Sequence, residues 1–312
     1  MEAAFKLCQV LLPQYYERLK DIEGLYISLC VFNGLLSFTA IVGNVVIIFA
    51  LKRASSIPSP ARILMLCLAV TDLCNGVFVH PLYIALILKI QQQFSCENIS
   101  EILLVFFILG TSSITMSFNT VIFIGVDRLL AILLHLRYKE LITPGRVKLA
   151  MACSWILSIT IIFFCVFYNL EFGEIAMVCF GYCGLLLLTI VYGKVFLVAR
   201  HHAANINSQA QTTIHLSRLS TLAQNRNLAI KTFYVYIVFV LCNCPYFITE
   251  TVLINSDPDI RIQTAIHLTT ILLMLNSSLN PLIFAWKLKE IRQIVKNNFK
   301  MFIFFRQSEN DS

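Results

Sequence analysis

The sequence contains seven apolar stretches, each long enough to cross a lipid bilayer as a helix: 25–51, 61–88, 99–132, 147–168, 175–201, 227–254 and 262–286. About 20 apolar residues span the hydrocarbon core of a membrane, and backbone groups there must be paired within the segment. A barrel would instead need alternating strands of about 10 residues, and the run 45–51 (VVIIFAL) does not alternate. The sequence therefore predicts an all-α fold, a seven-transmembrane helix bundle.

The composition excludes the main alternatives to a membrane protein. Apolar residues make up 58% of the chain and charged residues only 13%, whereas a soluble domain has roughly 45–50% and about 25%. The same numbers exclude a disordered chain. No basic stripe lies in a soluble domain, so we expect no nucleic-acid partner.

Lysine and arginine residues gather on one side of the predicted bundle. Only five of the 24 fall on the other side, namely Lys6, Arg18, Lys20, Lys89 and Arg261. By the positive-inside rule the basic side is cytoplasmic. We therefore expect a multi-pass plasma-membrane protein with an extracellular N-terminus (1–24), the bundle (25–286) and a cytoplasmic tail (306–312). Residues 287–305 place apolar side chains at helical spacing between lysines, which predicts an amphipathic helix on the inner lipid surface.

The 11 cysteines form no pattern typical of a metal site, and most lie in apolar runs as small hydrophobic residues. Cys8 and Cys96 are the two in segments expected outside, so a disulfide between them is one option. The sequence Asn98-Ile99-Ser100 makes Asn98 the outward glycosylation acceptor.

A carboxylate lies near the middle of the second span, at Asp72. A buried charge needs a cation, a proton or hydrogen-bond donors. The partners expected if spans two, three and seven pack together are Ser117, Asn276, Ser277 and Asn280, and Asn44 would complete the cluster. One interpretation is a polar packing cluster. The favoured one is a sodium- or proton-binding switch, in which sodium is an allosteric ligand and no other cofactor is expected.

The pair Asp127-Arg128 ends the third span. It is either an interfacial ion pair of little energetic weight or a latch, in which Arg128 leaves Asp127 to meet an inner partner. Pro245 and Pro281 permit kinks in the last two spans.

These residues together resemble the rhodopsin-like G-protein-coupled receptors, over about residues 25 to 300. The motifs follow in order, one in each predicted span: Gly43-Asn44, Leu68-Ala69-x-x-Asp72, Asp127-Arg128-Leu129, Trp155, Tyr192, Cys242-x-x-Pro245 and Asn280-Pro281-x-x-Phe284. The stretches 127–147 and 276–292 look most like the adenosine, melanocortin and lipid-receptor branch.

The resemblance implies a ligand-gated switch whose inner helix ends open for a heterotrimeric G protein, with arrestin and receptor kinases as further family partners. It implies roles in coupling or switching for Asp127, Arg128, Tyr192, Asn280, Pro281 and Phe284, and a sodium pocket at Asp72, Ser117, Asn276, Ser277 and Asn280. The chain departs from the family at several positions. Leu103 replaces the cysteine of the common disulfide, Gly184 the proline of span five, and Asn243 the aromatic residue of span six.

The ligand class follows mostly by exclusion from the same resemblance. Gly110 replaces the acid that binds amines, Met274 the lysine that binds retinal, and Glu250 the asparagine that binds adenosine. Leu82, Leu103 and Phe107 stand where melanocortin receptors carry acids. The expected pocket is Phe107, Gly110, Thr111, Asn243, Tyr246, Phe247, Glu250, His267 and Met274. It suits a lipid, a small amphiphile or a peptide terminus on Glu250. Glu250 is equally explained as an exposed acid at a helix end, and His267 is better explained as an interface residue.

Two other classes of function are less consistent with the sequence. A transporter or channel could also use a buried Asp72, but the chain shows no internal repeat with paired interrupted spans. An enzyme would need a nucleophile or metal set, and the six histidines are scattered. We therefore expect a receptor and no enzymatic activity.

Overall fold

The computed structural model describes the backbone of residues 2–92, 95–134, 137–168, 170–209, 216–256 and 260–298. Side chains are described for 23–92, 95–134, 137–165, 172–200, 227–256 and 261–298. The elements are α1 (Glu2–Arg53), α2 (Ser59–Cys74), η1 (Asn75–Val79), α3 (His80–Gln91), α4 (Cys96–Leu133), α5 (Tyr138–Leu141), α6 (Pro144–Tyr168), α7 (Leu170–Gln209), α8 (Leu216–Asn255) and α9 (Ile260–Lys287). A further helix covers residues 289–298.

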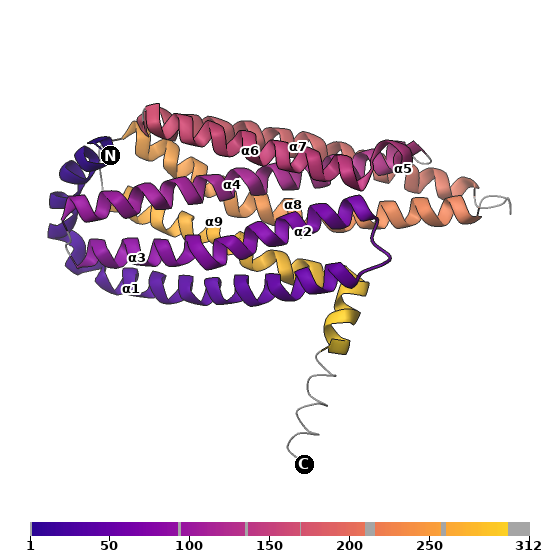
Figure 1. Cartoon of the computed structure of the whole chain (residues 1–312), viewed down its shortest axis with the longest axis horizontal. Helices are drawn as coiled ribbons and strands as arrows, with labels where there is room; N and C mark the ends of the chain where they lie inside the picture. Colours follow the sequence, from indigo (N-terminus) through magenta and orange to yellow (C-terminus); the bar gives the residue numbers. More distant parts are fainter. Residues whose placement is uncertain are drawn as a thin grey trace, which may run out of the picture.

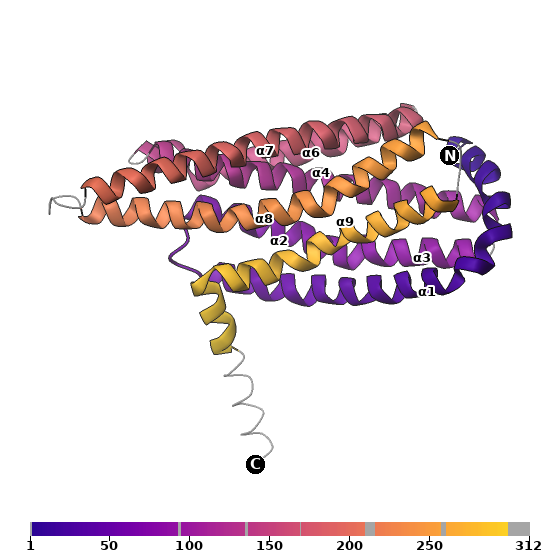
Figure 2. The same ribbon diagram turned by 180° about the vertical axis from the view of Figure 1, so that it is seen from behind.

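Within these described parts, seven helical segments are long and apolar enough to cross a membrane. They are Glu23–Arg53, Ser59–Gln91, Cys96–Leu133, Pro144–Cys165, Phe172–Arg200, Asn227–Asn255 and Arg261–Lys287. Each overlaps one of the seven apolar stretches in the sequence. The predicted fold class is confirmed: the segments lie side by side as one elongated bundle, and helix 289–298 turns away from the end of α9 (Figures 1 and 2).

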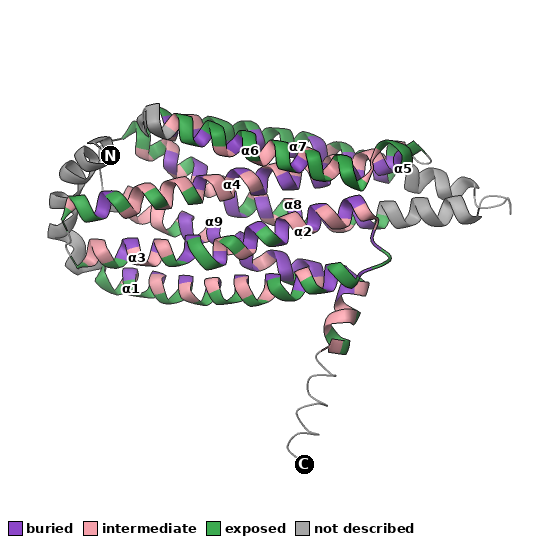
Figure 3. Ribbon diagram, in the orientation of Figure 1, coloured by how far each residue is buried: buried purple, intermediate pink, exposed green. Residues whose placement is uncertain are grey.

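The outward faces of the bundle carry large apolar side chains. Val31, Phe38, Leu149, Phe164 and Leu282 are each more than 60% exposed, and exposed positions follow the outer surface along the helices (Figure 3). Such a surface would be unstable in water but matches lipid chains. The protein is therefore a multi-pass membrane protein.

The second span is interrupted by a π-helical turn, η1, that the sequence reading did not foresee. The His80 amide donates to the Asn75 carbonyl, five residues back. The next donor in that series would belong to Pro81, which has no N–H. The Gly76 carbonyl instead accepts the Ser37 hydroxyl at 2.8 Å. A Cβ on Gly76 would lie 2.9 Å from Ile41, so the missing side chain is what lets α1 approach closely enough to make this bond.

At the end of the bundle where α9 finishes, helix 289–298 lies against the loop between α1 and α2. The Glu290 carboxylate accepts the Ser55 amide at 2.7 Å and the Ser56 amide at 3.1 Å. Partial burial alone would raise the pKa of Glu290, but these hydrogen bonds outweigh it and hold the pKa below its ordinary value of 4.5. Arg53 also donates to Asn298.

Candidate functional site

The predicted mid-membrane polar residues come together where α1, α2, α4 and α9 meet. Asp72 is fully buried and accepts the Asn280 amide at 2.8 Å. Asn75 donates to the Ser277 hydroxyl at 3.0 Å, and Asn44 donates to the Ser277 carbonyl at 3.1 Å. Ser117 and Asn276 are buried and line a cavity together with Ser277.

This polar cluster is short of donors. Buried oxygens that lack a hydrogen-bond partner within the described part of the chain belong to Asp72 (Oδ1), Asn44, Asn276 and Asn280 (each Oδ1). Unsatisfied buried acceptors are costly, most of all on a carboxylate. Carboxylate, amide and hydroxyl oxygens are also the ligands that hard cations prefer. The chemistry of these residues therefore fits a small hard cation. No group of three His, Cys, Asp or Glu side chains that could hold a transition metal occurs among the residues described.

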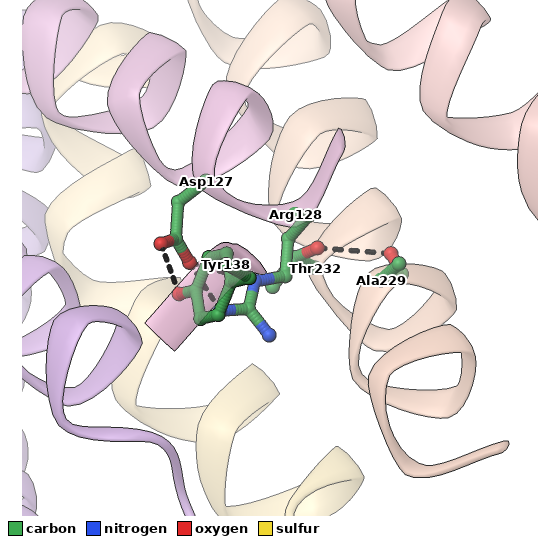
Figure 4. A network of polar contacts seen from close by, with 5 residues as sticks. All are labelled: Asp127, Arg128, Tyr138, Ala229 and Thr232. Atoms are coloured by element: carbon green, nitrogen blue, oxygen red, sulfur yellow. Dashed lines mark hydrogen bonds and ion pairs between the residues drawn. The ribbon is translucent and has the colours of Figure 1, made fainter. Parts of the chain in front are cut away.

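A second charged site lies near the C-terminal end of α4, where Asp127 and Arg128 are only 4% and 1% exposed. Arg128 donates from Nε to Asp127 at 3.0 Å and forms a second contact from Nη2. The Tyr138 hydroxyl, on the short helix α5, donates to the other Asp127 oxygen at 2.6 Å. Figure 4 shows Asp127 held between these two partners. Burial, followed by the neighbouring Asp127 charge, raises the pKa of Tyr138, so this hydroxyl stays a donor.

The other predicted switch residues are packed inside the bundle. Tyr192 stacks on Tyr236 at 4.8 Å between ring centroids and donates to the Val121 carbonyl. Phe284 is buried in the main apolar core. Pro281 lies against Gly43, where an added Cβ would be 2.9 Å away. None of these three side chains faces the inner surface in this arrangement.

A central cavity of about 70 Å³ lies between η1, α4, α8 and α9. Its wall includes six of the nine predicted pocket residues, namely Phe107, Gly110, Thr111, Asn243, Tyr246 and Met274. Its floor includes Ser117, Asn276 and Ser277 of the mid-membrane cluster. The cavity and the cluster are therefore one continuous region.

Three predicted pocket residues do not line this cavity. His267 faces α1 and α3, because its Nδ1 pairs with the Tyr83 hydroxyl at 2.9 Å and its ring meets Tyr26 edge-on. Glu250 is 8% exposed and so is not an exposed acid at a helix end. Phe247 packs against Phe118 in an aromatic cluster. The helical period places each residue on a span but does not fix which side of the span faces the cavity.

The aromatic cluster consists of Phe118, Phe180, Phe239 and Phe247. Phe118 lies at its centre, 4.7 Å from Phe239 and 5.9 Å from Phe247 between ring centroids. Glycines on α7 make room for it, since a Cβ on Gly184 would lie 2.9 Å from Phe118. Asn243, which replaces an aromatic residue of the family, bonds the Phe239 carbonyl of its own helix at 2.7 Å. Phe239 also lines the cavity, so the aromatic cluster borders the cavity directly.

The structure adds three residues that the sequence reading missed: Asn33, His80 and Tyr138. His80 and Asn33 form a buried pair between α3 and α1, and Tyr138 completes the Asp127 site. A histidine directly before Pro81, inside an apolar span, was the available signal for His80. Tyr138 gave none, because its role depends on how α5 folds back.

The predicted glycosylation acceptor and the predicted disulfide bear less on function. Asn98 is exposed in the first turn of α4, and glycosylation there stays a prediction. Cys96 is a free thiol, so the structure contains no disulfide at this residue, and the side chain of Cys8 lies outside the described residues.

Comparison with known proteins agrees with this geometry. The chain matches the model of the 7 transmembrane receptor (rhodopsin family) over residues 43–174 and 168–284. It is 27% identical over 305 residues to adenosine receptor A3 of Canis lupus familiaris, covering 88% of this chain and 92% of that receptor. It is 24% identical to melanocortin receptor 5 of Rattus norvegicus over 267 residues, covering 84% and 81% of the two chains. Trace amine-associated receptor 4 of Rattus norvegicus is 29% identical over 288 residues, covering 81% and 80%. A transporter finds no support in these matches. The chain belongs to the rhodopsin family of seven-transmembrane receptors, which signal through G proteins.

Proposed function

We propose that a ligand in the central cavity releases Arg128 from its buried contact, and that the inner helix ends then open to a heterotrimeric G protein. The observation that carries this proposal is the closed arrangement of Asp127, Arg128 and Tyr138. A guanidinium that is 1% exposed is out of reach of any partner protein. Arg128 Nη1 has no hydrogen-bond partner within the described residues, so the pair leaves part of the charge uncompensated. A poorly compensated buried charge favours a second state in which it is better satisfied.

The proposed ligand is a small amphiphile or lipid. The relatives include receptors named for adenosine, melanocortin and trace amines, but the described cavity wall contains no carboxylate that would pair with an amine. Glu250, the candidate for a peptide terminus, is not on that wall. A second cavity of about 100 Å³, between α4, α6 and α7, shares Phe107 and Thr111 with the first. Its mostly apolar lining supports an apolar ligand body.

The mid-membrane cluster is proposed to hold a sodium ion that stabilises the closed arrangement. Asp72 would supply the negative charge, and oxygens of Ser117, Asn276, Ser277 and Asn280 would complete the site. The unpartnered oxygens described above support this role. The ion would be an allosteric ligand that biases one helix arrangement.

The proposed orientation has the N-terminus outside the cell and the C-terminus in the cytoplasm. The basic residues at the end containing Arg128 support it. Arrestin and receptor kinases are proposed as further partners at the same end, and membrane lipids as partners of helix 289–298.

The test is nucleotide exchange on purified G proteins of each class, with and without a lipid panel. Arg128→Ala is expected to lower exchange at least about tenfold at equal surface expression, because it removes the released side chain. Lys148→Ala is the matched control, since Lys148 is an exposed basic residue at the same end of the bundle. Unchanged exchange by Arg128→Ala, or no exchange by the unaltered chain under any condition, would contradict the proposal.

A further inference from the structure

His80 is the one histidine in the lining of the central cavity, and its side chain is completely buried. It follows the π-helical turn η1 and precedes Pro81, so it lies where the second span is bent. None of the relatives' names and none of the sequence motifs above assigns it a role. Its hydrogen bonds determine what it offers to a ligand.

The peptide carbonyl of His80 fixes the orientation of the Asn33 amide. A carbonyl can only accept, so the Asn33 atom that lies 3.1 Å from it is the Nδ2 donor. Asn33 Oδ1 therefore faces the His80 ring, 2.6 Å from Nδ1. Because an amide oxygen can only accept, His80 Nδ1 must carry the proton.

This proton assignment leaves Nε2 of the neutral ring as an acceptor. Nδ1 is paired with α1, so Nε2 is the ring atom that can still accept a hydrogen bond, and it belongs to a residue that lines the cavity. It has no hydrogen-bond partner within the described part of the structure. Asn276 Oδ1, on the wall of the same cavity, is a second buried acceptor without a partner there. A buried acceptor without a partner is costly, so a ligand that supplies a donor is favoured over one that does not.

We propose that His80 Nε2 is the hydrogen-bond acceptor for the buried end of the ligand, which therefore carries an O–H or N–H group at that end. This inference rests on the proposed function only in taking the central cavity as the ligand site. A pure hydrocarbon, an ether or an ester at that position would leave Nε2 unpaired. Asn33 is a positioning residue, because it holds the ring in the tautomer that accepts.

The test uses two probe molecules of similar shape that differ in one donor. Phenol carries an O–H, and anisole has a methyl group in its place. Their dissociation constants are measured by ligand-observed NMR on the purified full chain in phosphatidylcholine nanodiscs, without G protein. Phenol is expected to bind about tenfold more tightly than anisole, because anisole leaves the buried acceptor unpaired.

Four variants assign this preference to a residue. His80→Leu removes the acceptor and should bring the phenol-to-anisole ratio close to one. Asn33→Leu keeps the histidine but removes the acceptor that holds the ring proton on Nδ1. The ratio should therefore fall although the cavity wall is unchanged. Asn276→Ala removes the competing unpartnered acceptor, and most of the ratio should remain if His80 is the site. Thr270→Val is the matched control, because it removes a hydroxyl from the same cavity wall and should leave the ratio unchanged. A ratio is used because partial unfolding lowers the affinity for both probes equally.

The proposal is overturned if the unaltered chain binds phenol and anisole equally or binds neither at millimolar concentration. It is also overturned if His80→Leu keeps the full preference, or if Asn276→Ala abolishes it. A tenfold ratio in a chain that activates no G protein would support the His80 site while contradicting the proposed signalling. The two failures are therefore distinguishable.

Discussion

Two buried carboxylates differ sharply in how well they are satisfied. Both oxygens of Asp127 have partners, Tyr138 on one and Arg128 on the other. Asp72 Oδ2 accepts the Asn280 amide at 2.8 Å, and Oδ1 has no hydrogen-bond partner within the described residues. The Asp127 carboxylate is therefore fully paired, although Arg128 Nη1 is not, and the proposed opening has to break this contact. Asp72 is an incomplete site whose state depends on what binds there.

The largest effect is expected from Asp127→Ala, which breaks the completed contact. Removing one member of a buried ion pair costs about 3–5 kcal/mol, because the other charge stays buried alone. Arg128 would leave its site more easily, so basal nucleotide exchange should rise while thermal stability falls. A thermal unfolding curve and a basal exchange assay check this. Exchange that falls in step with the amount of folded protein would mean that the pair does not restrain the switch.

Asp72→Asn should instead cost little stability and remove a dependence on salt. The unaltered chain should unfold at a higher temperature in sodium than in an equal concentration of N-methylglucamine, by an amount equivalent to about 1–3 kcal/mol if sodium exceeds its dissociation constant. The neutral amide at position 72 cannot attract the ion, so this difference should vanish. Equal sodium dependence in both proteins would remove Asp72 from the site.

Tyr138→Phe sharpens the comparison by leaving one Asp127 oxygen without its donor. Hydrogen bonds to charged groups contribute about 1.5–3 kcal/mol, so a loss of this size is expected from the closed state. Asp127 would then resemble Asp72, with one satisfied oxygen. The measurements are thermal unfolding and basal exchange. The matched position Tyr234, a partly exposed tyrosine on α8 with its ring over Lys287, should tolerate the same change with unaltered exchange.

The aromatic cluster around Phe118, which borders the cavity through Phe239, offers a test of whether the cavity and the Asp127 site communicate. Gly184→Ala places a methyl group 2.9 Å from Phe118, and overpacking costs about 1–3 kcal/mol. Gly193→Ala on the same helix meets nothing within 4 Å and serves as the control. Of these two variants, only Gly184→Ala is expected to alter ligand-stimulated nucleotide exchange. Identical behaviour of the two variants would show that Phe118 does not transmit the ligand signal.

The fold could be predicted because long apolar segments indicate membrane-spanning helices. Which side of each helix faces the interior of the bundle could not be predicted. A membrane helix is apolar on both sides, so burial leaves no periodic polar face to read. Phe247 is completely buried and Leu241, six residues earlier on α8, is 64% exposed. Nothing in their residue types separates them.

The polar residues were predicted better because each one in a span requires a partner. Asp72, Asn280 and Ser277 do meet, as the cost of burying them suggested. His267 and Glu250 do not line the cavity, and His267 pairs instead with the Tyr83 hydroxyl. The turn η1 depends on Pro81 together with the close approach of Ser37, which is a tertiary contact.

The smallest effect concerns Glu290, which has the loop between α1 and α2 as its partner. Its pKa is held below 4.5 in the folded state, so its contribution is fully present above that pH and is lost as the pH falls through the lowered value. The protection factors of the Ser55 and Ser56 amides should then fall about twofold to fivefold, as for a weak surface contact. Glu290→Gln should show no such step below pH 4.5. A step of equal size in that variant would assign it to another group.

The central claim is that the buried Arg128 contact opens when the G protein binds. Spin-labelled amino acids at Leu133 on α4 and Ile230 on α8, both exposed near the inner end, allow the distance between these helices to be measured by pulsed EPR. We predict one short distance in the purified receptor and a longer population once nucleotide-free G protein is added. An unchanged distance distribution in a complex that still catalyses nucleotide exchange would contradict the account.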